Sequence, residues 1–376
     1  MSESGDSQEA FGEAFGRTTD PLSAFEPVFE ELRADPLEFF IEEDLLNSGL
    51  KEGTIAGHLV TYQQWREYMS EVGRHPACPS EEHVQGFARW LQEDLGNQSV
   101  VTIRQKLQKL NRAYRFWQEE PTLPHTLEYD IVRSARNKID WSEFEDTETK
   151  RPHPIPIEAI RERISEITDL LDYTCVLLQL KLGLRVGEVR NVRFRDLNIP
   201  DEELAAVYPA LGTHELVTDR PDILYIPSKT ERDGNKSTVG RLLPIDEEVR
   251  RILVRYLLIR PSVDDEHLPI SQRHDRPSGR HINNVWQDAF LPEYGETNEY
   301  RAVSSHFGRH YFTTYWKKEQ GLQSELVQYM RGDRVGDPVS DGSAMHHYLH
   351  TYYRDIEDRY RKDIYQLVPK EPWSVV

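Results

Sequence analysis

A polar, proline-bearing stretch at residues 143–156 divides this chain of 376 residues into two unequal parts. It ends in Arg151-Pro-His-Pro-Ile-Pro156, where each proline removes a backbone donor and opposes helix formation. A chain of this length is also too long for one ordinary hydrophobic core. We therefore predict a linker at 143–156 between a helical domain at 41–142 and a second domain at 157–376, preceded by an acidic, flexible leader at 1–40.

The first domain is predicted to be all helical. Apolar residues recur at helical spacing through 54–72, and a Pro-Ser start suits an N-cap for a helix at 81–95. The helix expected at 99–117 has one apolar stripe, formed by Ile103, Leu107, Leu110, Tyr114 and Trp117. Its basic residues fall largely outside that stripe and are candidate contacts to a DNA backbone: Arg104, Lys106, Lys109, Arg112 and Arg115. The alternative is an ordinary solvated charged face.

The net charge of −19 argues at first against DNA binding, because nucleic-acid binders usually present a basic patch. The charge is uneven, however. Residues 1–48 hold 13 acidic and 2 basic side chains, whereas residues 97–118 hold five basic and no acidic ones. The total therefore does not exclude a basic groove. An acidic surface with few lysines also suits a salt-rich cytoplasm, so we expect a halophilic source, such as an archaeon or its virus.

Composition limits the compartment and the kinds of site. Cys78 and Cys175 are the only cysteines, which excludes a disulfide framework and a thiolate zinc site and fits a reducing cytoplasm. No apolar run approaches the roughly 20 residues that cross a bilayer, and the acidic start does not resemble a signal peptide. We expect a cytoplasmic protein without a membrane partner.

The second domain mixes helical and strand patterns. Strands are expected at 223–227 and 238–245, joined by a loop in which Gly234 can turn the chain. Helices are expected at 167–182, 246–258, 282–290, 305–318 and 344–367. The predicted fold class is mainly α, with an all-α first domain and an α+β second domain that contains a small antiparallel sheet.

The segment Leu182-Gly-Leu-Arg-Val-Gly-Glu188 places an arginine where one helix ends and another begins. The first helix is expected to end at Gly183, so Arg185 stands at the start of the next. A helix N-terminus attracts phosphate, and a guanidinium adds a planar fork of donors. Glu188 and Asp196 are interpreted as braces of this turn. Taken alone, Arg185 would more often be a structural ion-pair partner than a catalytic residue.

A second segment, Ser304-Ser-His-Phe-Gly-Arg-His310, gathers basic groups on one helical face. Ser305 can cap this helix, which puts His306, Arg309 and His310 at i, i+3 and i+4. Two histidines four residues apart can bind a metal, but an arginine on the same face opposes a metal cation. We therefore expect no metal ion here and favour an anionic phosphate.

These motifs occur together in a recognisable order. Gly-Leu-Arg-x-x-Glu at Arg185, His-x-x-Arg-His at Arg309 and Tyr-x-His at Tyr348 resemble the tyrosine recombinase (phage integrase) family. The resemblance covers about residues 155–366 and, less distinctly, the helical region at 50–140, which is similar to the family's core-binding domain. It implies an enzyme that cuts and rejoins DNA through a covalent tyrosine link, without ATP, a metal or another cofactor.

The resemblance also implies roles for individual residues. Arg185 and Arg309 would clamp the scissile phosphate, and His306 would hydrogen-bond it with support from His310. Lys229, at the end of an expected strand, would protonate the leaving 5′-oxygen. Lys236 lies on the same hairpin and is its competitor.

Tyr348, in Tyr348-Leu-His350, fits the signature of the nucleophile. Tyr352 and Tyr353 are its competitors, and three nearby histidines are candidates to influence its proton: His346, His347 and His350. Alternatively, Tyr348, Tyr352 and Ile356 lie four residues apart and form a buried stripe.

One position departs from the family's pattern. Where the family usually has Leu-Gly-His before the tyrosine, this chain has Tyr329-Met-Arg-Gly-Asp333, followed by a glycine-bearing insertion at 334–343. A carboxylate does not readily donate to a phosphate oxygen, and its charge repels one. Either Asp333 has another role, or the missing donor is supplied by Arg331, Arg334 or His346.

The resemblance thus implies a site-specific recombinase or integrase whose two domains close as a C-shaped clamp on double-stranded DNA. Recombination in this family implies a homotetramer on paired sites, and the segment after Tyr365 is expected to dock on a neighbouring protomer. Two alternatives stay open. One is a type IB topoisomerase-like enzyme that acts as a monomer, and the other is a non-catalytic DNA-binding regulator, for which Asp333 is the best argument.

Overall fold

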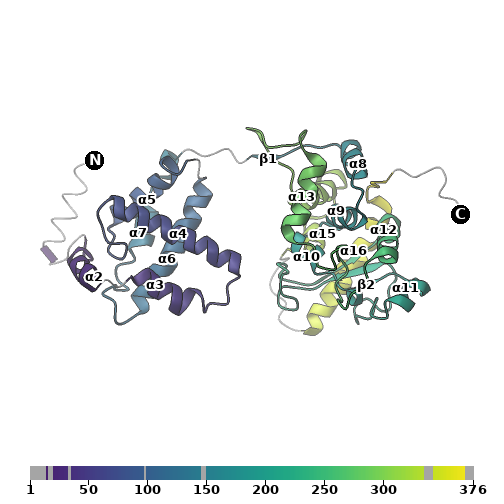
Figure 1. Cartoon of the computed structure of the whole chain (residues 1–376), viewed down its shortest axis with the longest axis horizontal. Helices are drawn as coiled ribbons and strands as arrows, with labels where there is room; N and C mark the ends of the chain where they lie inside the picture. Colours follow the sequence, from purple (N-terminus) through teal and green to yellow (C-terminus); the bar gives the residue numbers. More distant parts are fainter. Residues whose placement is uncertain are drawn as a thin grey trace. The chain divides into compact units, whose positions relative to one another are not determined.

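The computed structural model describes residues 14–15, 20–32, 35–96, 99–144, 150–333 and 342–368, without the side chains of 342–348 and 350. The chain forms two compact units, Met1–Thr149 and Lys150–Val376 (Figure 1). Each unit has its own hydrophobic core. No helix within the described ranges is long and apolar enough to span a membrane.

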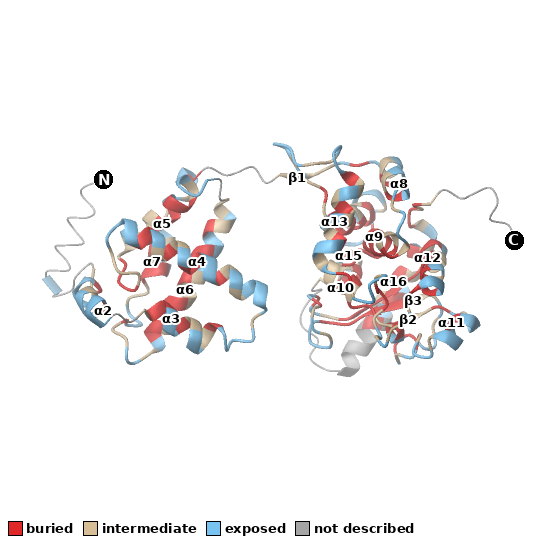
Figure 2. Ribbon diagram, in the orientation of Figure 1, coloured by how far each residue is buried: buried red, intermediate tan, exposed pale blue. Residues whose placement is uncertain are grey.

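The first unit is a set of helices around an aromatic core. Its helices are α2 (Glu26–Leu32), α3 (Pro36–Phe40), α4 (Glu52–Glu71), α5 (Glu81–Glu93), α6 (Val100–Glu119) and α7 (Ile131–Lys138), with short helical turns at Ser23–Phe25, Ile41–Leu45 and Trp141–Glu143. Ser80 caps α5 as predicted, because its hydroxyl accepts from the amide of His83. The predicted stripe of α6 is buried, and the red inner faces in Figure 2 show how the helices share one interior.

The leader is more ordered than its acidic composition predicts. Leu22, Phe29, Leu37 and Phe40 are buried in the core of the first unit, and Trp117 donates its indole N–H to the carbonyl of Pro36 at 2.9 Å. The prediction of a loosely attached leader is therefore wrong for residues 20–32 and 35–40. Its apolar side chains are few but spaced to reach one surface, and the surrounding acids hid that pattern.

The second unit is also mainly helical. Its helices are α8 (Ile157–Ser165), α9 (Leu170–Leu182), α10 (Val186–Arg190), α11 (Glu202–Val207), α12 (Glu247–Ile259), α13 (Gly279–Phe290), α14 (His306–Thr314), α15 (Ser324–Arg331) and α16 (Gly342–Asp363). A short 3₁₀ turn spans Phe194–Asp196, and a π-helical turn at Tyr315–Glu319 continues α14. The helix predicted at 305–318 is therefore real but changes its winding in its last turn.

Two small sheets accompany these helices. The main sheet has the order β2 (Leu197–Asn198), β3 (Ile223–Ile226), β4 (Arg241–Pro244), and all its pairings are antiparallel. Strands β1 (Arg151–Pro152) and β5 (Tyr300–Arg301) form a separate parallel pair. The predicted fold class is confirmed. The strand expected at 238–245 is shorter than predicted, because residues before Gly240 belong to the hairpin loop and Gly240 itself sits against the Tyr225 ring.

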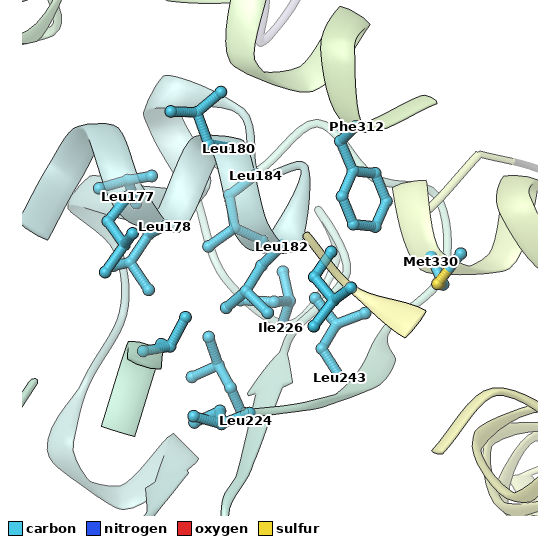
Figure 3. Close-up of a cluster of buried hydrophobic side chains, with 14 of the residues drawn as sticks. Leu177, Leu178, Leu180, Leu182, Leu184, Leu224, Ile226, Leu243, Phe312 and Met330 are labelled. Carbon is cyan, nitrogen blue, oxygen red and sulfur yellow. The ribbon is translucent and has the colours of Figure 1, made fainter. Parts of the chain in front are cut away.

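The core of the second unit surrounds α9. Ten of the 13 residues of this helix are buried, so it is covered on nearly all sides. Figure 3 shows its leucines meeting Leu224 and Ile226 of β3, Leu243 of β4 and Phe312 of α14. Helix α14 lies very close to α9 at Gly308, where a Cβ atom would lie only 3.1 Å from the backbone of Gln179. This close packing sets the two motif-bearing segments against each other.

The last described residues bind to their own unit. Buried Lys181 contacts Asp246 at 2.7 Å, Glu248 at 2.8 Å and the carbonyl of Tyr365 at 2.6 Å. The amides of Leu367 and Val368 donate to Glu248. The segment that was expected to dock on a neighbouring protomer therefore binds in cis as far as Val368.

Candidate active site

The turn between α9 and α10 positions Arg185. Helix α9 ends at Gly183, whose φ of +63° is the left-handed conformation that glycine readily adopts at helix ends. Arg185 is the N-cap residue of α10, as predicted, and its backbone amide donates to Glu188 Oε2 at 2.8 Å. Glu188 therefore braces this turn, as the sequence indicated. Asp196 is likewise a brace, because it is fully buried and ion-paired with Arg232.

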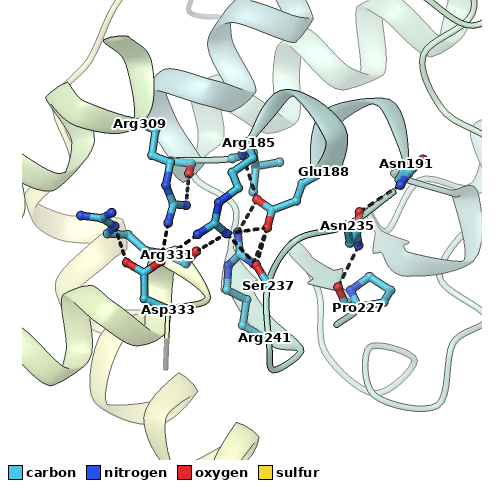
Figure 4. A network of polar contacts seen from close by, with 12 residues as sticks. Arg185, Glu188, Asn191, Pro227, Asn235, Ser237, Arg241, Arg309, Arg331 and Asp333 are labelled. Atoms are coloured by element: carbon cyan, nitrogen blue, oxygen red, sulfur yellow. Dashed lines mark hydrogen bonds and ion pairs between the residues drawn. The ribbon is translucent and has the colours of Figure 1, made fainter. Parts of the chain in front are cut away.

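Glu188 is the centre of a buried polar network (Figure 4). Arg241 donates to both of its carboxylate oxygens, at 3.1 and 2.8 Å. Glu188 Oε1 also accepts from the Ser237 hydroxyl and, at 3.2 Å, from Arg185 Nη1. Burial acts to raise the pKa of the Glu188 carboxyl, but the Arg241 charge and the hydrogen bonds from Arg241 and Ser237 hold this pKa at about 2. Glu188 thus stays ionised and holds two arginines in fixed positions.

Arg309 comes from α14 and is buried, with 5% of its surface exposed. Its Nη1 donates at 2.8 Å to the carbonyl of Gly183, the residue that ends α9. Burial, followed by the nearby charge of Arg185, lowers the pKa of Arg309 to about 9, so its guanidinium stays protonated at neutral pH. Ser305 is the N-cap residue of α14, as predicted, but its side chain makes no capping hydrogen bond, because its backbone is helical (φ −54°, ψ −17°) and not extended. Its amide and hydroxyl both donate to the side-chain oxygen of Asn283, at 3.2 and 3.3 Å.

Arg185 and Arg309 converge on one carboxylate oxygen (Figure 4). Asp333 Oδ1 lies 2.8 Å from Arg185 Nη2 and 2.9 Å from Arg309 Nη2. Asp333 Oδ2 lies 2.8 Å from Arg331 Nε. The structure therefore brings together the two arginines of the sequence motifs. Asp333, the residue that differs from the family's pattern, contacts both of them.

The backbone of Asp333 is fixed by the end of α15. The amide of Gly332 donates to the carbonyl of Tyr329 at 2.8 Å and that of Asp333 to the carbonyl of Gln328 at 3.0 Å, which is a Schellman motif. Gly332 has φ +67°, and a Cβ on it would lie 2.4 Å from Arg241 Nη1. Glycine at this position allows the helix end to approach the network around Glu188.

The two histidines of α14 are exposed on either side of Arg309 in the sequence. Partial desolvation, followed by the charges of Arg301 and Arg309, lowers the pKa of His306. Desolvation and the charge of Arg301 also lower the pKa of His310. Both imidazoles are thus neutral at neutral pH, and each can donate one hydrogen bond and accept another.

The two candidate lysines lie on the hairpin between β3 and β4. The amide of Lys229 donates to the carbonyl of Ser237 at 2.8 Å, so the lysines belong to opposite arms of the loop. Lys236 is exposed between buried Asn235 and buried Ser237. The Ser237 hydroxyl accepts from Arg185 Nη1 at 2.8 Å, and the charge of Lys236 contributes to the lowered pKa of His306. Lys236 is therefore next in sequence to a residue that contacts Arg185, and its charge acts on His306.

Helix α16 carries the candidate tyrosines. Residue 348 lies within this helix, but its side chain is outside the described residues, as are the side chains of His346, His347 and His350. Tyr353 is fully buried, and its hydroxyl donates to Glu357 at 3.0 Å. Burial raises the pKa of Tyr353. Tyr352 is half-buried and stacks on Tyr329, with 5.2 Å between ring centroids.

The buried stripe of α16 differs from the predicted one. It is formed by Leu349, Tyr353, Ile356 and Tyr360, so Ile356 alone of the predicted stripe is fully buried among the side chains described. The Leu349 carbonyl lies 3.1 Å from Tyr329 Oη, which also accepts from the amide of Leu242 in β4. The helix is thereby anchored beside β4 at the residue after position 348. Arg334, another candidate for the hydrogen-bond donor that Asp333 does not supply, lies outside the described residues.

The basic residues of α6 do not form one exposed row. Lys106 is buried and donates to Gln64 at 2.7 Å, and Lys109 donates to the carbonyl of Gly57 at 2.8 Å. Arg112 pairs with Asp44 at 2.6 Å. Arg104, which lies 4.5 Å from the centroid of the Trp141 ring, and Arg115 are exposed. Five DNA contacts were expected, but three of the cations are engaged by neighbouring helices and turns of the same unit.

Within the part of the chain that the structure describes, no cluster of three or more His, Cys, Asp and Glu side chains could hold a metal ion. The candidate site is instead lined by guanidinium groups, which suit an anion.

No family model and no curated protein matches the sequence. Solved structures do match. The Tn1549 transposon integrase in complex with transposon right end DNA superposes with a TM-score of 0.56 and 15% identity, over 87% of this chain and 99% of that one. The chain has the integrase fold.

Two lambda integrase structures agree. A dimer bound to a COC′ core site gives a TM-score of 0.54 with 13% identity, over 81% of this chain and 94% of that one. A tetramer bound to a Holliday junction gives 0.54 with 13% identity, over 84% of each chain. The fold that the sequence motifs implied is therefore confirmed.

Sequence reasoning missed Arg241 and Ser237, which hold Glu188. Arg241 is fully buried at the start of β4, directly before the apolar residues Leu242 and Leu243. A buried guanidinium requires an ionised partner. The charged residue in a predicted core strand was therefore the signal that could have linked this strand to Glu188.

Proposed function

We propose that this protein is a site-specific DNA recombinase that cleaves and rejoins strands through a 3′-phosphotyrosyl link. The main support is the convergence of Arg185 and Arg309 on one anionic oxygen, in a chain with the integrase fold. Two guanidinium groups aimed at one oxygen suit a phosphodiester, because they neutralise the charge that develops on its oxygens in the transition state. The solved Tn1549 integrase with this fold is bound to transposon right end DNA, and the lambda integrase dimer is bound to a COC′ core site.

In the proposed reaction, Tyr348 Oη attacks the phosphorus and the bond between phosphorus and the 5′-oxygen breaks. The products are a 3′-phosphotyrosyl link and a free 5′-hydroxyl. The 5′-hydroxyl of a second strand then attacks the link and releases the tyrosine, so neither ATP nor a metal is consumed. The assignment of Tyr348 rests on its Tyr-x-His signature. The backbone of the next residue, Leu349, accepts from Tyr329 at 3.1 Å. Neutral His306 would donate to a non-bridging oxygen.

We assign protonation of the leaving 5′-oxygen to Lys236, and not to Lys229, which the sequence favoured. Ser237, the neighbour of Lys236, contacts Arg185. A substrate with sulfur at the bridging 5′ position tests this assignment, because a thiolate leaves without a proton donor. Lys236→Ala should cleave the oxygen substrate slowly and the sulfur substrate at the wild-type rate. If the sulfur substrate restored the rate of Lys229→Ala and not that of Lys236→Ala, the proton donor would be Lys229.

A covalent-adduct assay tests the function itself. Duplexes that the wild-type protein selects from a random-sequence pool are nicked so that the short 5′-hydroxyl fragment is lost after cleavage. We expect a protein–DNA adduct with the wild type and with Tyr352→Phe, and none with Tyr348→Phe. An adduct in Tyr348→Phe would move the nucleophile to another tyrosine. Binding by the wild type without any adduct would favour the DNA-binding regulator, which the position of Asp333 between the arginines also favours.

We further propose that the protein works as a homotetramer on paired sites, as the lambda integrase does on a Holliday junction. Two labelled duplexes with the selected sequence should yield recombinant products and a junction intermediate. Relaxation of a supercoiled plasmid without exchange between duplexes would favour the type IB topoisomerase-like alternative.

A further inference from the structure

The carboxylate of Asp333 lies where the proposed ligand must bind. We propose that Asp333 is an internal substitute for the scissile phosphate and must leave Arg185 and Arg309 before DNA is cleaved. The identity of the displacing group as a DNA phosphodiester rests on the proposed function. The competition itself concerns any phosphate-like anion.

The geometry of the contact is that of a phosphate oxygen. A single atom, Asp333 Oδ1, accepts from Nη2 of Arg185 at 2.8 Å and from Nη2 of Arg309 at 2.9 Å. Charge-assisted bonds between a guanidinium and a phosphate oxygen have the same length, about 2.7–2.9 Å. Two anions in hydrogen-bond contact with the same two nitrogens would repel each other strongly, so the carboxylate and the phosphate exclude each other.

The other terminal nitrogen of each arginine is directed at protein acceptors. Arg185 Nη1 donates to Ser237 at 2.8 Å and to Glu188 at 3.2 Å, and Arg309 Nη1 donates to the carbonyl of Gly183 at 2.8 Å. The two Nη2 atoms are therefore the ones that face a ligand. Asp333 occupies the point at which both are aimed (Figure 4).

Release of Asp333 requires a side-chain rotation and not a movement of its backbone. The Schellman motif at Gly332 fixes the amide of Asp333, and Arg241 Nε binds the carbonyl of Met330 at 2.8 Å. Arg331 Nε lies 2.8 Å from Asp333 Oδ2, whereas Arg185 and Arg309 contact the other oxygen, Oδ1. A displaced carboxylate can thus stay paired with Arg331 while phosphate takes the position of Oδ1.

Charge balance adds a second consequence. The contacts join four guanidinium groups, those of Arg185, Arg241, Arg309 and Arg331, to two carboxylates, those of Glu188 and Asp333. Loss of the Asp333 charge leaves Arg185 and Arg309 facing each other with no anion between them. Neutralising Asp333 should therefore lower the stability of the ligand-free protein and increase its affinity for phosphate. If Asp333 only formed a structural ion pair, neutralising it would lower the stability without increasing the affinity.

The test uses the full chain and inorganic phosphate as the probe. Asp333→Asn should bind phosphate at least about tenfold more tightly than the wild type, since the two charge-assisted hydrogen bonds from Arg185 and Arg309 to the Asp333 carboxylate no longer have to be broken first. Without phosphate it should unfold at a lower temperature, and phosphate should raise that temperature more than in the wild type. Asp333→Ala should behave in the same way if the asparagine variant does not fold.

Asp172→Asn is the matched control. It removes one carboxylate, which pairs with His281, near the start of α9, about 15 Å along the helix axis from Leu182, the last residue of α9 before the turn that carries Arg185. Equal phosphate affinity in Asp333→Asn and wild type would overturn the proposal, and so would an equal gain in Asp172→Asn. Loss of the gain in Asp333→Asn with Arg185→Ala would place the phosphate in the clamp. Because this assay involves no DNA, tight phosphate binding without any covalent adduct would refute the recombinase and leave Asp333 as the competitor.

Discussion

Glu188 and Arg241 form a fully buried ion pair, in which Arg241 Nη2 lies 2.8 Å from Glu188 Oε2. Glu188 also accepts from the backbone of Arg185, and Arg241 donates to the carbonyl of Met330, three residues before Asp333. One pair thus connects the two segments that meet at the candidate phosphate site. This buried pair links the backbone of Arg185 to the segment that carries Asp333, in addition to the direct contact between the two side chains.

Glu188→Gln should destabilise the protein by about 3–5 kcal/mol, because it leaves the buried Arg241 charge without an ionised partner. Urea unfolding of the full chain, followed by tryptophan fluorescence, measures the loss. Glu203→Gln is the control, since Glu203 is exposed on α11, and it should change stability by less than about 0.5 kcal/mol.

The effect of Glu188→Gln should depend on pH. The pKa of Glu188 is about 2 in the folded protein, below its ordinary value of 4.5. Its ionised form therefore stabilises the fold fully above pH 4.5, and this contribution is lost as the pH falls from 4.5 towards 2. The difference between wild type and variant should shrink over that window. A difference that stays constant down to pH 3 would contradict the depressed pKa.

Gly332→Ala should be much more costly than Gly321→Ala. Both glycines have positive φ, +67° and +62°, so an alanine at either position is strained by about 1 kcal/mol. A Cβ at Gly321 meets nothing within 4 Å, whereas one at Gly332 would lie 2.4 Å from Arg241 Nη1 and 2.5 Å from Ser237 Oγ. Thermal unfolding compares the two variants directly. Equal losses would show that the end of α15 can move away from Arg241.

The sequence predicted the site better where each residue belongs to a continuous local pattern. Arg185 follows a helix that ends at glycine, and Arg309 lies at a defined spacing within one helix, so both were placed correctly. The contacts of Asp333 were not predicted, because its partners lie 148 and 24 residues away in the chain. Contacts of that range depend on how α9, α14 and α15 pack, which no local pattern specifies.

The basic face of α6 shows the same limit in the first unit. Periodicity located the helix and its apolar stripe. It could not show that Lys106 reaches Gln64 or that Lys109 reaches the carbonyl of Gly57, because these contacts depend on the distance between α6 and α4. Long lysine side chains bury their stems and end on whatever acceptor lies nearby, so a helical wheel overestimates the exposed charge.

His58 should make the first unit sensitive to mild acid. Burial, followed by the charges of Lys109 and Arg112, lowers the pKa of His58 from 6.5 to about 4. The unfolded chain therefore takes up a proton at a higher pH than the folded one, and stability falls as the pH decreases from 6.5 to 4. At about 1.36 kcal/mol per pKa unit, the difference between 6.5 and about 4 corresponds to a loss of about 3 kcal/mol. Urea unfolding of His58→Gln between pH 7 and pH 4 should show a shallower decline than the wild type, and parallel declines would contradict the assignment.

Arg115 and Lys106 should separate DNA contact from structure on the same helix. Arg115 is exposed, whereas Lys106 is buried and binds Gln64 at 2.7 Å. If α6 faces DNA, Arg115→Ala should weaken binding and reduce the slope of log affinity against log salt by about 1, because one fewer counterion is released. Lys106→Ala should leave that slope unchanged and lower stability instead, since it removes a buried hydrogen bond.

Titrations of the selected duplex at several salt concentrations, beside thermal unfolding of each variant, make this comparison. An unchanged slope in Arg115→Ala would exclude this residue as a phosphate contact. A reduced slope in Lys106→Ala would mean that DNA draws its ammonium group away from Gln64. The net charge of −19 makes the comparison sharp, because a binding surface on so acidic a chain must consist of a few well-placed cations, each of which contributes measurably to the slope.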